Sequence, residues 1–165
     1  MTDPPQDERA LAARTIELAL DNVREGGKPF ACVVVDDATG EVLVEATNQV
    51  AATGDVTAHA EVTALRRLAE HGRSGLAGCT VYVTAYPCPM CLGALYYAAP
   101  ERLVFAASRE QEGEHYEDGN RYMSLATFYD EYAKPPAARS LPSTQAAVDD
   151  PVAPFRAWQQ AHPDG

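Results

Sequence analysis

The sequence is short of basic side chains. In 165 residues, 13 Lys and Arg stand against 24 Asp and Glu, so the formal net charge is −11. A protein that holds a nucleic-acid backbone by charge needs the opposite balance, so this composition argues against bulk electrostatic binding of RNA or DNA. No apolar run approaches the length of a membrane-spanning helix. The segment Met1–Glu8 also lacks the basic start and apolar run of a signal peptide.

Cysteine is scarce as well, with four in the whole chain. Without an export signal, four cysteines in a chain of this length do not indicate a disulfide framework, so we expect a cytoplasmic protein. The remaining composition is that of a globular protein, with 46% hydrophobic and 22% charged residues. The length suits one domain over residues 1–165. Because several prolines interrupt residues 134–165, we expect an extended C-terminal arm there.

Helical and strand patterns alternate along the chain. Apolar residues three to four positions apart predict helices, and short β-branched runs predict strands. The predicted helices cover residues 7–25, 58–71, 87–97, 122–132 and 155–160. The predicted strands cover residues 30–35, 41–46, 80–84 and 102–106. The turn residues 36–40 make the first two strands a hairpin, and the later alternation favours parallel pairing. Residues 108–120 are charged and irregular.

Two short motifs carry the chemistry. Thr57-Ala58-His59-Ala60-Glu61 opens the second helix, and Pro87-Cys88-Pro89-Met90-Cys91 opens the third. Together they offer one imidazole and two thiolates, which are good zinc ligands, and helix N-termini favour thiolates. Three protein ligands leave a fourth position for water, and Glu61 could move protons beside it. The pattern H-x-E…P-C-x-x-C is the signature of zinc-dependent deaminases.

The cysteines also allow two alternative interpretations. A structural zinc site would need a fourth ligand, for which Cys32 and Cys79 are candidates. Both fall in strand patterns and look like core residues. A redox-active Cys88-Pro89-Met90-Cys91 would explain neither His59 nor Glu61. An open, catalytic zinc (Zn²⁺) site therefore accounts for more of the pattern.

The chain resembles the cytidine deaminase-like superfamily and, within it, the bacterial guanine deaminases. The likeness is strongest in residues 57–65 and 87–94. It is weaker in Lys28-Pro29-Phe30, at Asn48 and in Phe155-Arg156-Ala157-Trp158. The resemblance implies an α/β fold, a three-layer α/β/α sandwich with a mixed five-stranded sheet, although the patterns above predict only four strands. It also implies a homodimer, in which the C-terminal arm is exchanged between subunits in some relatives.

The resemblance implies roles for single residues. His59, Cys88 and Cys91 would bind zinc, and Glu61 would be the general acid and base. Asp118 would help to orient the ring and to move protons. The expected substrate contacts are Phe30 on the ring face, Asn48 on the ring or carbonyl edge, Tyr97 as an aromatic that closes the pocket from the same or the partner subunit, and Ala60, Tyr86, Pro87 and Glu117 around them.

The sequence departs from the guanine deaminase pattern before the Pro-Cys motif and in a charged segment, among other positions. Tyr86 stands where Glu is usual, and Ala85 where Cys is usual; this is either a packing change or a changed pocket rim. The charged segment 112–123 is either a lid or a solvated loop, and both interpretations stay open.

We expect a zinc-dependent hydrolytic deaminase of a free nucleobase or related amino-azaheterocycle, similar to guanine deaminase, that releases ammonia. The alternative is an s-triazine, cytosine or cytidine-analogue deaminase with the same chemistry. A tRNA adenosine deaminase is disfavoured by the acidic charge, and a non-catalytic partner subunit by the presence of Glu61. The expected partners are a small heterocycle and a second copy of the chain, with neither nucleic acid nor membrane.

Overall fold

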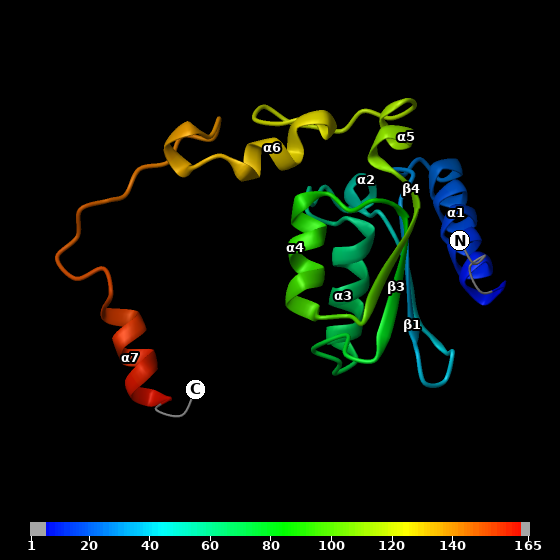
Figure 1. Ribbon diagram of the computed structural model, residues 1–165, viewed down its shortest axis with the longest axis horizontal. Coiled ribbons are helices and arrows are strands. Elements are labelled where there is room, and N and C mark those ends of the chain that lie inside the picture. Colours follow the sequence, from blue (N-terminus) through cyan, green and yellow to red (C-terminus); the bar gives the residue numbers. More distant parts are fainter. Residues whose placement is uncertain (1–5, 163–165) are drawn as a thin grey trace.

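A computed structural model describes residues 6–162 as a sheet between two layers of helices (Figure 1). Helix α1 (Gln6–Arg24) covers one face of the sheet, and α3 (Ala60–Glu70) and α4 (Pro89–Ala98) cover the other. This arrangement confirms the α/β class. In the described residues, no helix is long and apolar enough to cross a membrane.

The sheet is mixed and has four strands in the described part of the chain, in the order β2-β1-β3-β4. The strands are β1 (Ala31–Asp36), β2 (Val42–Thr47), β3 (Cys79–Ala85) and β4 (Arg102–Ala107). Strand β1 pairs antiparallel with both β2 and β3, whereas β3 and β4 are parallel. The hairpin and the parallel pair are therefore as predicted.

The expected fifth strand is not formed in residues 6–162, and this corrects the fold implied by the resemblance. After β4 the chain enters the short helix α5 (Arg109–Gly113) instead of a crossover to another strand. The residues that follow are rich in charged side chains and proline. They contain no run of β-branched residues that could add a strand to the edge of the sheet.

The core lies mainly between the sheet and α3 and α4. Alternate residues of the central strands point to opposite faces, as strand geometry requires. Cys32 and Val34 face the α3–α4 side, whereas Val33 and Val35 face α1. Because both faces are covered, β1 is buried along nearly its whole length, which explains its continuous apolar sequence.

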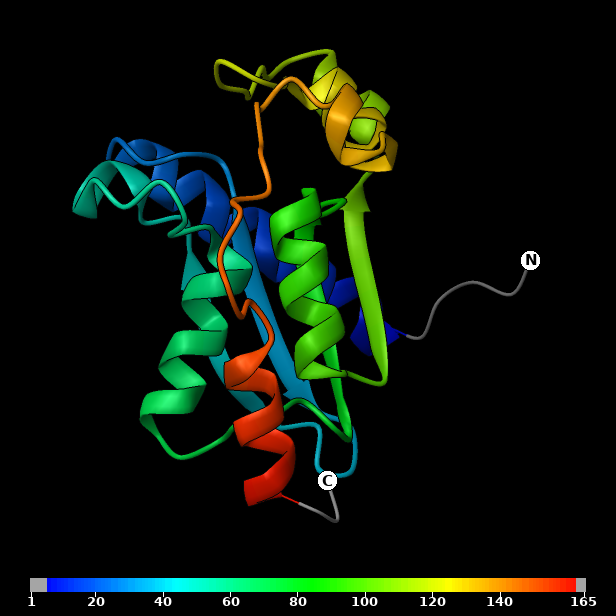
Figure 2. The same ribbon diagram turned by 90° about the vertical axis from the view of Figure 1, so that its left-hand side faces the viewer.

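The last third of the chain leaves these layers. After α5 come the 3-10 turn Leu125–Thr127 and α6 (Phe128–Ala133), so the predicted helix 122–132 is shorter and begins later than expected. The rest of the arm holds the 3-10 turn Pro136–Ala138 and α7 (Ala153–Ala161). Figure 1 shows α5 just beyond the end of β4 and α6 above α4, and the arm continues from α6 to α7 (Figures 1 and 2). Helix α2 (Val50–Thr53) precedes α3.

Candidate active site

Two helix N-termini bring the metal-ligand candidates together. His59 is the N-cap residue of α3, and Cys88 is the N-cap residue of α4; both have extended backbone angles. Neither side chain caps its own helix, so both remain free to bind something else. The second helix was predicted to begin near Ala58, and its start at Ala60 places His59 at the position where helix N–H groups carry partial positive charge.

The donor atoms of His59, Cys88 and Cys91 form one compact cluster, with all three atoms within 4.8 Å of one another. Nδ1 of His59 lies 3.6 Å from Sγ of Cys88 and 3.5 Å from Sγ of Cys91. In a tetrahedral zinc site, Zn–N and Zn–S bonds of about 2.0 and 2.3 Å place nitrogen and sulfur ligands about 3.5 Å apart. The cluster therefore fits zinc in both donor type and spacing.

The proton affinities of these donors agree with a metal-binding set. Hydrogen bonds from Cys91 and His59 lower the pKa of the Cys88 thiol to about 4. The hydrogen bond to Cys88 raises the pKa of His59. The hydrogen bond to Cys88, together with burial, raises the pKa of Cys91. The three groups thus share protons that a bound metal ion would displace.

Glu61 lies in the first turn of α3, directly beside this cluster. Its side chain is only 7% exposed, and burial is the main cause that raises its pKa. A carboxyl group with a raised pKa can both accept and return a proton near neutral pH. The position and burial of Glu61 therefore suit proton transfer at the metal cluster.

The other two cysteines belong to the core, as predicted. Cys32 and Cys79 are buried at 1% and 0% exposure. Cys79 accepts a hydrogen bond from the Arg73 guanidinium at 2.9 Å. In the described residues the metal-ligand cluster contains neither of them. The cluster thus has three protein ligands, as expected for an open site.

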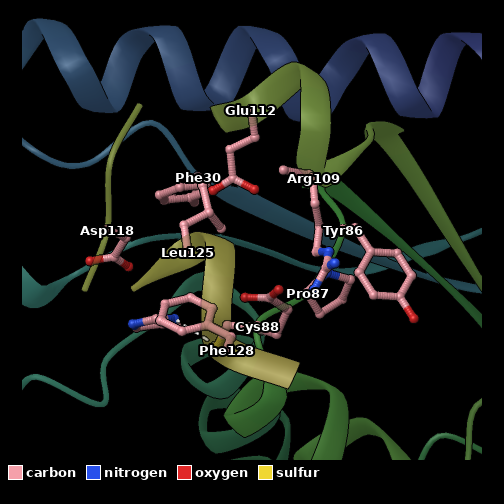
Figure 3. Close-up of a pocket in the computed structure, with 12 residues that line it drawn as sticks. Phe30, Tyr86, Pro87, Cys88, Arg109, Glu112, Asp118, Leu125 and Phe128 are labelled. Atoms are coloured by element: carbon pink, nitrogen blue, oxygen red, sulfur yellow. Dashed lines mark hydrogen bonds between the residues drawn. The ribbon is translucent and has the colours of Figure 1, made fainter. Parts of the chain in front are cut away.

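One pocket opens onto the cluster (Figure 3). His59, Glu61 and Cys88 line its base, and the expected contacts Phe30, Tyr86, Pro87 and Asp118 line its walls. Its free volume is about 30 Å³, which is enough for one or two water molecules. A heterocycle therefore needs part of the wall to move before it can enter.

Residues 108–128, here called the roof, close the pocket from above. Arg109, Glu112, Leu125 and Phe128 of the roof line the pocket, and sequence reasoning missed all four as site residues. The sequence did contain a helix-start signal for α5, the spacing S-x-x-Q of a capping box. In the structure, Ser108 and Gln111 form this capping box at the start of α5. The segment was instead predicted to be irregular.

Two contacts fasten the roof to the loop before β1. Nζ of Lys28 lies 3.4 Å from Oδ1 of Asp118. The ring of Phe30 meets the ring of Tyr116 edge-on, with centroids 5.1 Å apart. Asp118 thus enters the pocket wall with a cation beside it, and Phe30 has an aromatic neighbour from the roof.

Asn48 is buried, at 2% exposure, and does not line this pocket. Its Oδ1 accepts a hydrogen bond from the backbone N–H of Val50 at 3.1 Å. Its Nδ2 has no hydrogen-bond partner among the described residues. A buried donor without an acceptor is costly, so a ligand carbonyl or ring nitrogen would satisfy it.

Three further expected contacts lie away from the pocket. Tyr97 is 94% exposed on α4 and does not line the pocket of its own chain. Glu117 is exposed and lines a neighbouring hollow of the roof. Ala60 is fully buried in the core. Their contact roles stay predictions.

Tyr86 belongs to an aromatic group at the pocket rim. Its ring meets Phe105 edge-on at 5.1 Å and Tyr129 at 6.1 Å. The Arg109 guanidinium lies over the Tyr129 ring, 4.7 Å from its centroid. These contacts favour the interpretation of Tyr86 as a packing residue at the rim.

Comparison with known proteins agrees with this geometry. Residues 5–107 match the family of the cytidine and deoxycytidylate deaminase zinc-binding region. The guanine deaminase of Bacillus subtilis (strain 168) is 37% identical over 148 residues, which cover 88% of this chain and 90% of that protein. The X-ray structure of guanine deaminase from Bacillus subtilis superimposes with a TM-score of 0.83 and 34% identity, over 97% and 95% of the two chains.

A more distant similarity links the chain to RNA-modifying enzymes. The tRNA-specific adenosine deaminase of Agrobacterium fabrum is 37% identical over 124 residues, covering 71% of this chain and 80% of that protein. The fold and the His-Cys-Cys cluster define a zinc-dependent hydrolytic deaminase. The chain belongs to the cytidine and deoxycytidylate deaminase zinc-binding family.

Proposed function

We propose that this protein hydrolyses the exocyclic amino group of a free nucleobase, with guanine as the preferred base, and releases ammonia. One observation carries the proposal: the buried Glu61 and the His-Cys-Cys cluster open into the same small pocket, beside Phe30 and Asp118. Similarity to the Bacillus subtilis guanine deaminase over 88% of the chain supports the choice of base.

The proton steps fall to Glu61. His59, Cys88 and Cys91 would hold zinc, which would supply a Lewis acid that makes water a nucleophile at neutral pH. Glu61 accepts a proton from the attacking water and delivers it to the leaving nitrogen. The carbon–nitrogen bond breaks, the remaining proton of the added hydroxyl passes to the neighbouring ring nitrogen, a carbonyl forms, and ammonia leaves. The raised pKa of Glu61 matches this double role.

The remaining residues hold the ring. Phe30 offers an aromatic face, and Nδ2 of Asn48 donates to a ring acceptor. Asp118 stands in the wall as a second carboxylate with Lys28 beside it and takes part in orienting the ring. A pocket that combines an apolar face with a few directed polar groups is typical of small-molecule sites.

A free base is favoured over a tRNA substrate by two features. The roof leaves little free space over the cluster, and the net charge of −11 opposes a polynucleotide backbone. The ring of Tyr86 packs against Phe105. This contact supports the interpretation that Tyr in place of the usual Glu is a packing change at the pocket rim, and this interpretation favours guanine over s-triazine or cytosine rings.

Ammonia release from a substrate panel tests the proposal. The zinc-loaded protein would be assayed with guanine, adenine, cytosine, cytidine, guanosine, 5-azacytosine and ammeline. Turnover of guanine above all others is the expected result. Activity on ammeline or 5-azacytosine with guanine untouched would overturn the choice of base. No ammonia release from any compound of the panel, together with deamination of a tRNA substrate, would overturn the free-base proposal.

We also propose a homodimer in which the C-terminal arm is exchanged between subunits. Helix α7 has no buried residue, and its Phe155 and Trp158 are 72% and 65% exposed. Exposed aromatic side chains of this size mark an interaction surface. Tyr97, which does not line its own pocket, would then reach the site of the partner.

Light scattering tests the dimer. The double substitution Phe155→Ala and Trp158→Ala is expected to give monomers, and a monomeric unsubstituted protein would refute the proposal.

A cytoplasmic location completes the proposal. All four cysteines are free thiols, and free thiols persist in reducing compartments. Fractionation of the cells that produce the protein would test it, and enzyme found outside the cytoplasm would contradict it.

A further inference from the structure

Glu112 reaches the pocket from a direction opposite to the metal ligands. It comes from α5 of the roof, and its carboxylate points down into the pocket beside Phe30 and Leu125 (Figure 3). The roles proposed above for Glu61 and Asp118 do not involve it. The pocket thus contains a third carboxylate, placed where it would meet the far edge of a ring whose reacting carbon lies at the cluster.

Among the described residues, the carboxylate of Glu112 forms no ion pair. It is half-buried, and within residues 6–162 burial and the negative charges of Asp118, Cys88 and Glu61 act on it. Arg109, one helical turn away, is the cation that faces it. The Arg109 guanidinium lies over the ring of Tyr129 instead. A half-buried carboxylate without a donor is costly, and such groups cluster at functional sites.

We propose that Glu112 is a specificity-determining residue whose carboxylate accepts a hydrogen bond from a ring N–H of the bound base. This inference rests on the proposed base-deaminase function. An ionised carboxylate can only accept hydrogen bonds. A base with an N–H on the edge away from the reacting carbon supplies the missing donor. A ring without that N–H would leave the carboxylate desolvated and unpaired.

A site that hydrogen-bonds a substrate N–H rejects analogues that lack it, because its own polar group is then left without a partner. Glu112 would therefore separate guanine from rings of similar size that carry a methyl group or a bare nitrogen at that edge. Guanine has an N–H at N1 and one imidazole N–H that is shared between N7 and N9; 1-methylguanine lacks the first, and 7-methylguanine and 9-methylguanine both lack the second.

The test is the ratio of kcat/KM for guanine to kcat/KM for each methylguanine. Four zinc-loaded proteins would be compared: the unsubstituted protein, Glu112→Ala, Glu112→Gln and the control Glu114→Ala. Glu114 is a carboxylate two residues further on, with an exposed side chain, and it does not line the pocket. Gln has nearly the size of Glu and keeps an acceptor oxygen, so it separates the hydrogen bond from the space that the side chain fills.

For Glu112→Ala, we expect kcat/KM for guanine to fall about 10- to 100-fold, the range of one hydrogen bond to a charged group. The methylguanines that lack the recognised N–H (1-methylguanine alone, or 7-methylguanine and 9-methylguanine together) should be unaffected, so that the preference for guanine over them collapses. Glu112→Gln should keep most of the discrimination, and Glu114→Ala should change no ratio. Calorimetric binding of xanthine, the deaminated product, should weaken in Glu112→Ala alone.

Two results would overturn the inference while leaving the deaminase function intact. One is guanine turnover with all three ratios unchanged in Glu112→Ala. The other is a gain on a methylguanine with no loss on guanine, which would make Glu112 a steric wall. If the unsubstituted protein deaminates no guanine, the proposed function fails first, and the inference fails with it.

Discussion

The hydroxyl of Tyr129 donates a 2.6 Å hydrogen bond to the backbone carbonyl of Pro87. Pro87 immediately precedes the zinc-ligand candidate Cys88, and Tyr129 lies on α6, just after the roof. Burial raises the pKa of Tyr129, so its hydroxyl remains a donor through neutral pH. The turn that carries Cys88 is therefore tied to the segment that closes the pocket.

Removing this hydroxyl should loosen the metal site. Tyr129→Phe leaves the Pro87 carbonyl without its donor, at an expected cost of about 1 kcal/mol in the free energy of unfolding. We expect a lower melting temperature and faster transfer of zinc to a chromogenic chelator. Tyr132→Phe is the matched control, because Tyr132 is 53% exposed on the same helix. Zinc loss at the unsubstituted rate in Tyr129→Phe would contradict this coupling.

Metal content should depend on Cys91 and not on the core cysteines. Cys91→Ser replaces a thiolate by a weak ligand, so the purified protein should lose zinc on gel filtration and melt at a lower temperature. Cys79→Ser alters a buried cysteine outside the cluster and should keep its zinc. Metal analysis by mass spectrometry measures both. Full zinc occupancy in Cys91→Ser would show that the cluster is not the metal site.

Stability should depend on pH through Glu112. Burial, then the charges of Asp118, Cys88 and Glu61, raise its pKa to about 7 in the folded protein, against the partial relief given by Arg109. A carboxyl group with a raised folded-state pKa stabilises the fold below its unfolded pKa of about 4.5, and this contribution is lost as the pH rises towards about 7.

The substitution Glu112→Gln should remove this loss of stability with rising pH. The melting temperature of Glu112→Gln minus that of the unsubstituted protein should increase between pH 5 and pH 8, whereas the difference for Glu114→Gln should stay flat. Differential scanning fluorimetry of the zinc-loaded proteins measures both. A pH-independent difference for Glu112→Gln would show that Glu112 is charged throughout this range.

The metal cluster could be predicted from the sequence because its signal is local. Two motifs each place a donor at a helix start, and the structure makes His59 and Cys88 the N-cap residues of α3 and α4. The strands were also predictable, since β1 and β3 are buried on both faces and are therefore continuous apolar runs.

The pocket wall could not be predicted in the same way. Whether Glu112 points into a pocket or into solvent depends on where α5 ends and on how the roof packs over the cluster. A run of charged residues in the sequence does not predict either. Nor does the sequence show that Tyr97 is 94% exposed, because a pattern of apolar residues does not tell a core face from a subunit contact. The fifth strand was inferred from resemblance alone, and the chain after β4 forms α5 in its place.

The central claim is that the buried Glu61 moves the protons of the reaction beside a zinc site made by other residues. Zinc content and guanine turnover measured on one preparation of Glu61→Gln test it most directly. The account predicts full zinc occupancy and a fall in kcat of about 100- to 10,000-fold, the usual contribution of a positioned general acid or base. Near-normal turnover by the zinc-loaded Glu61→Gln protein would contradict it.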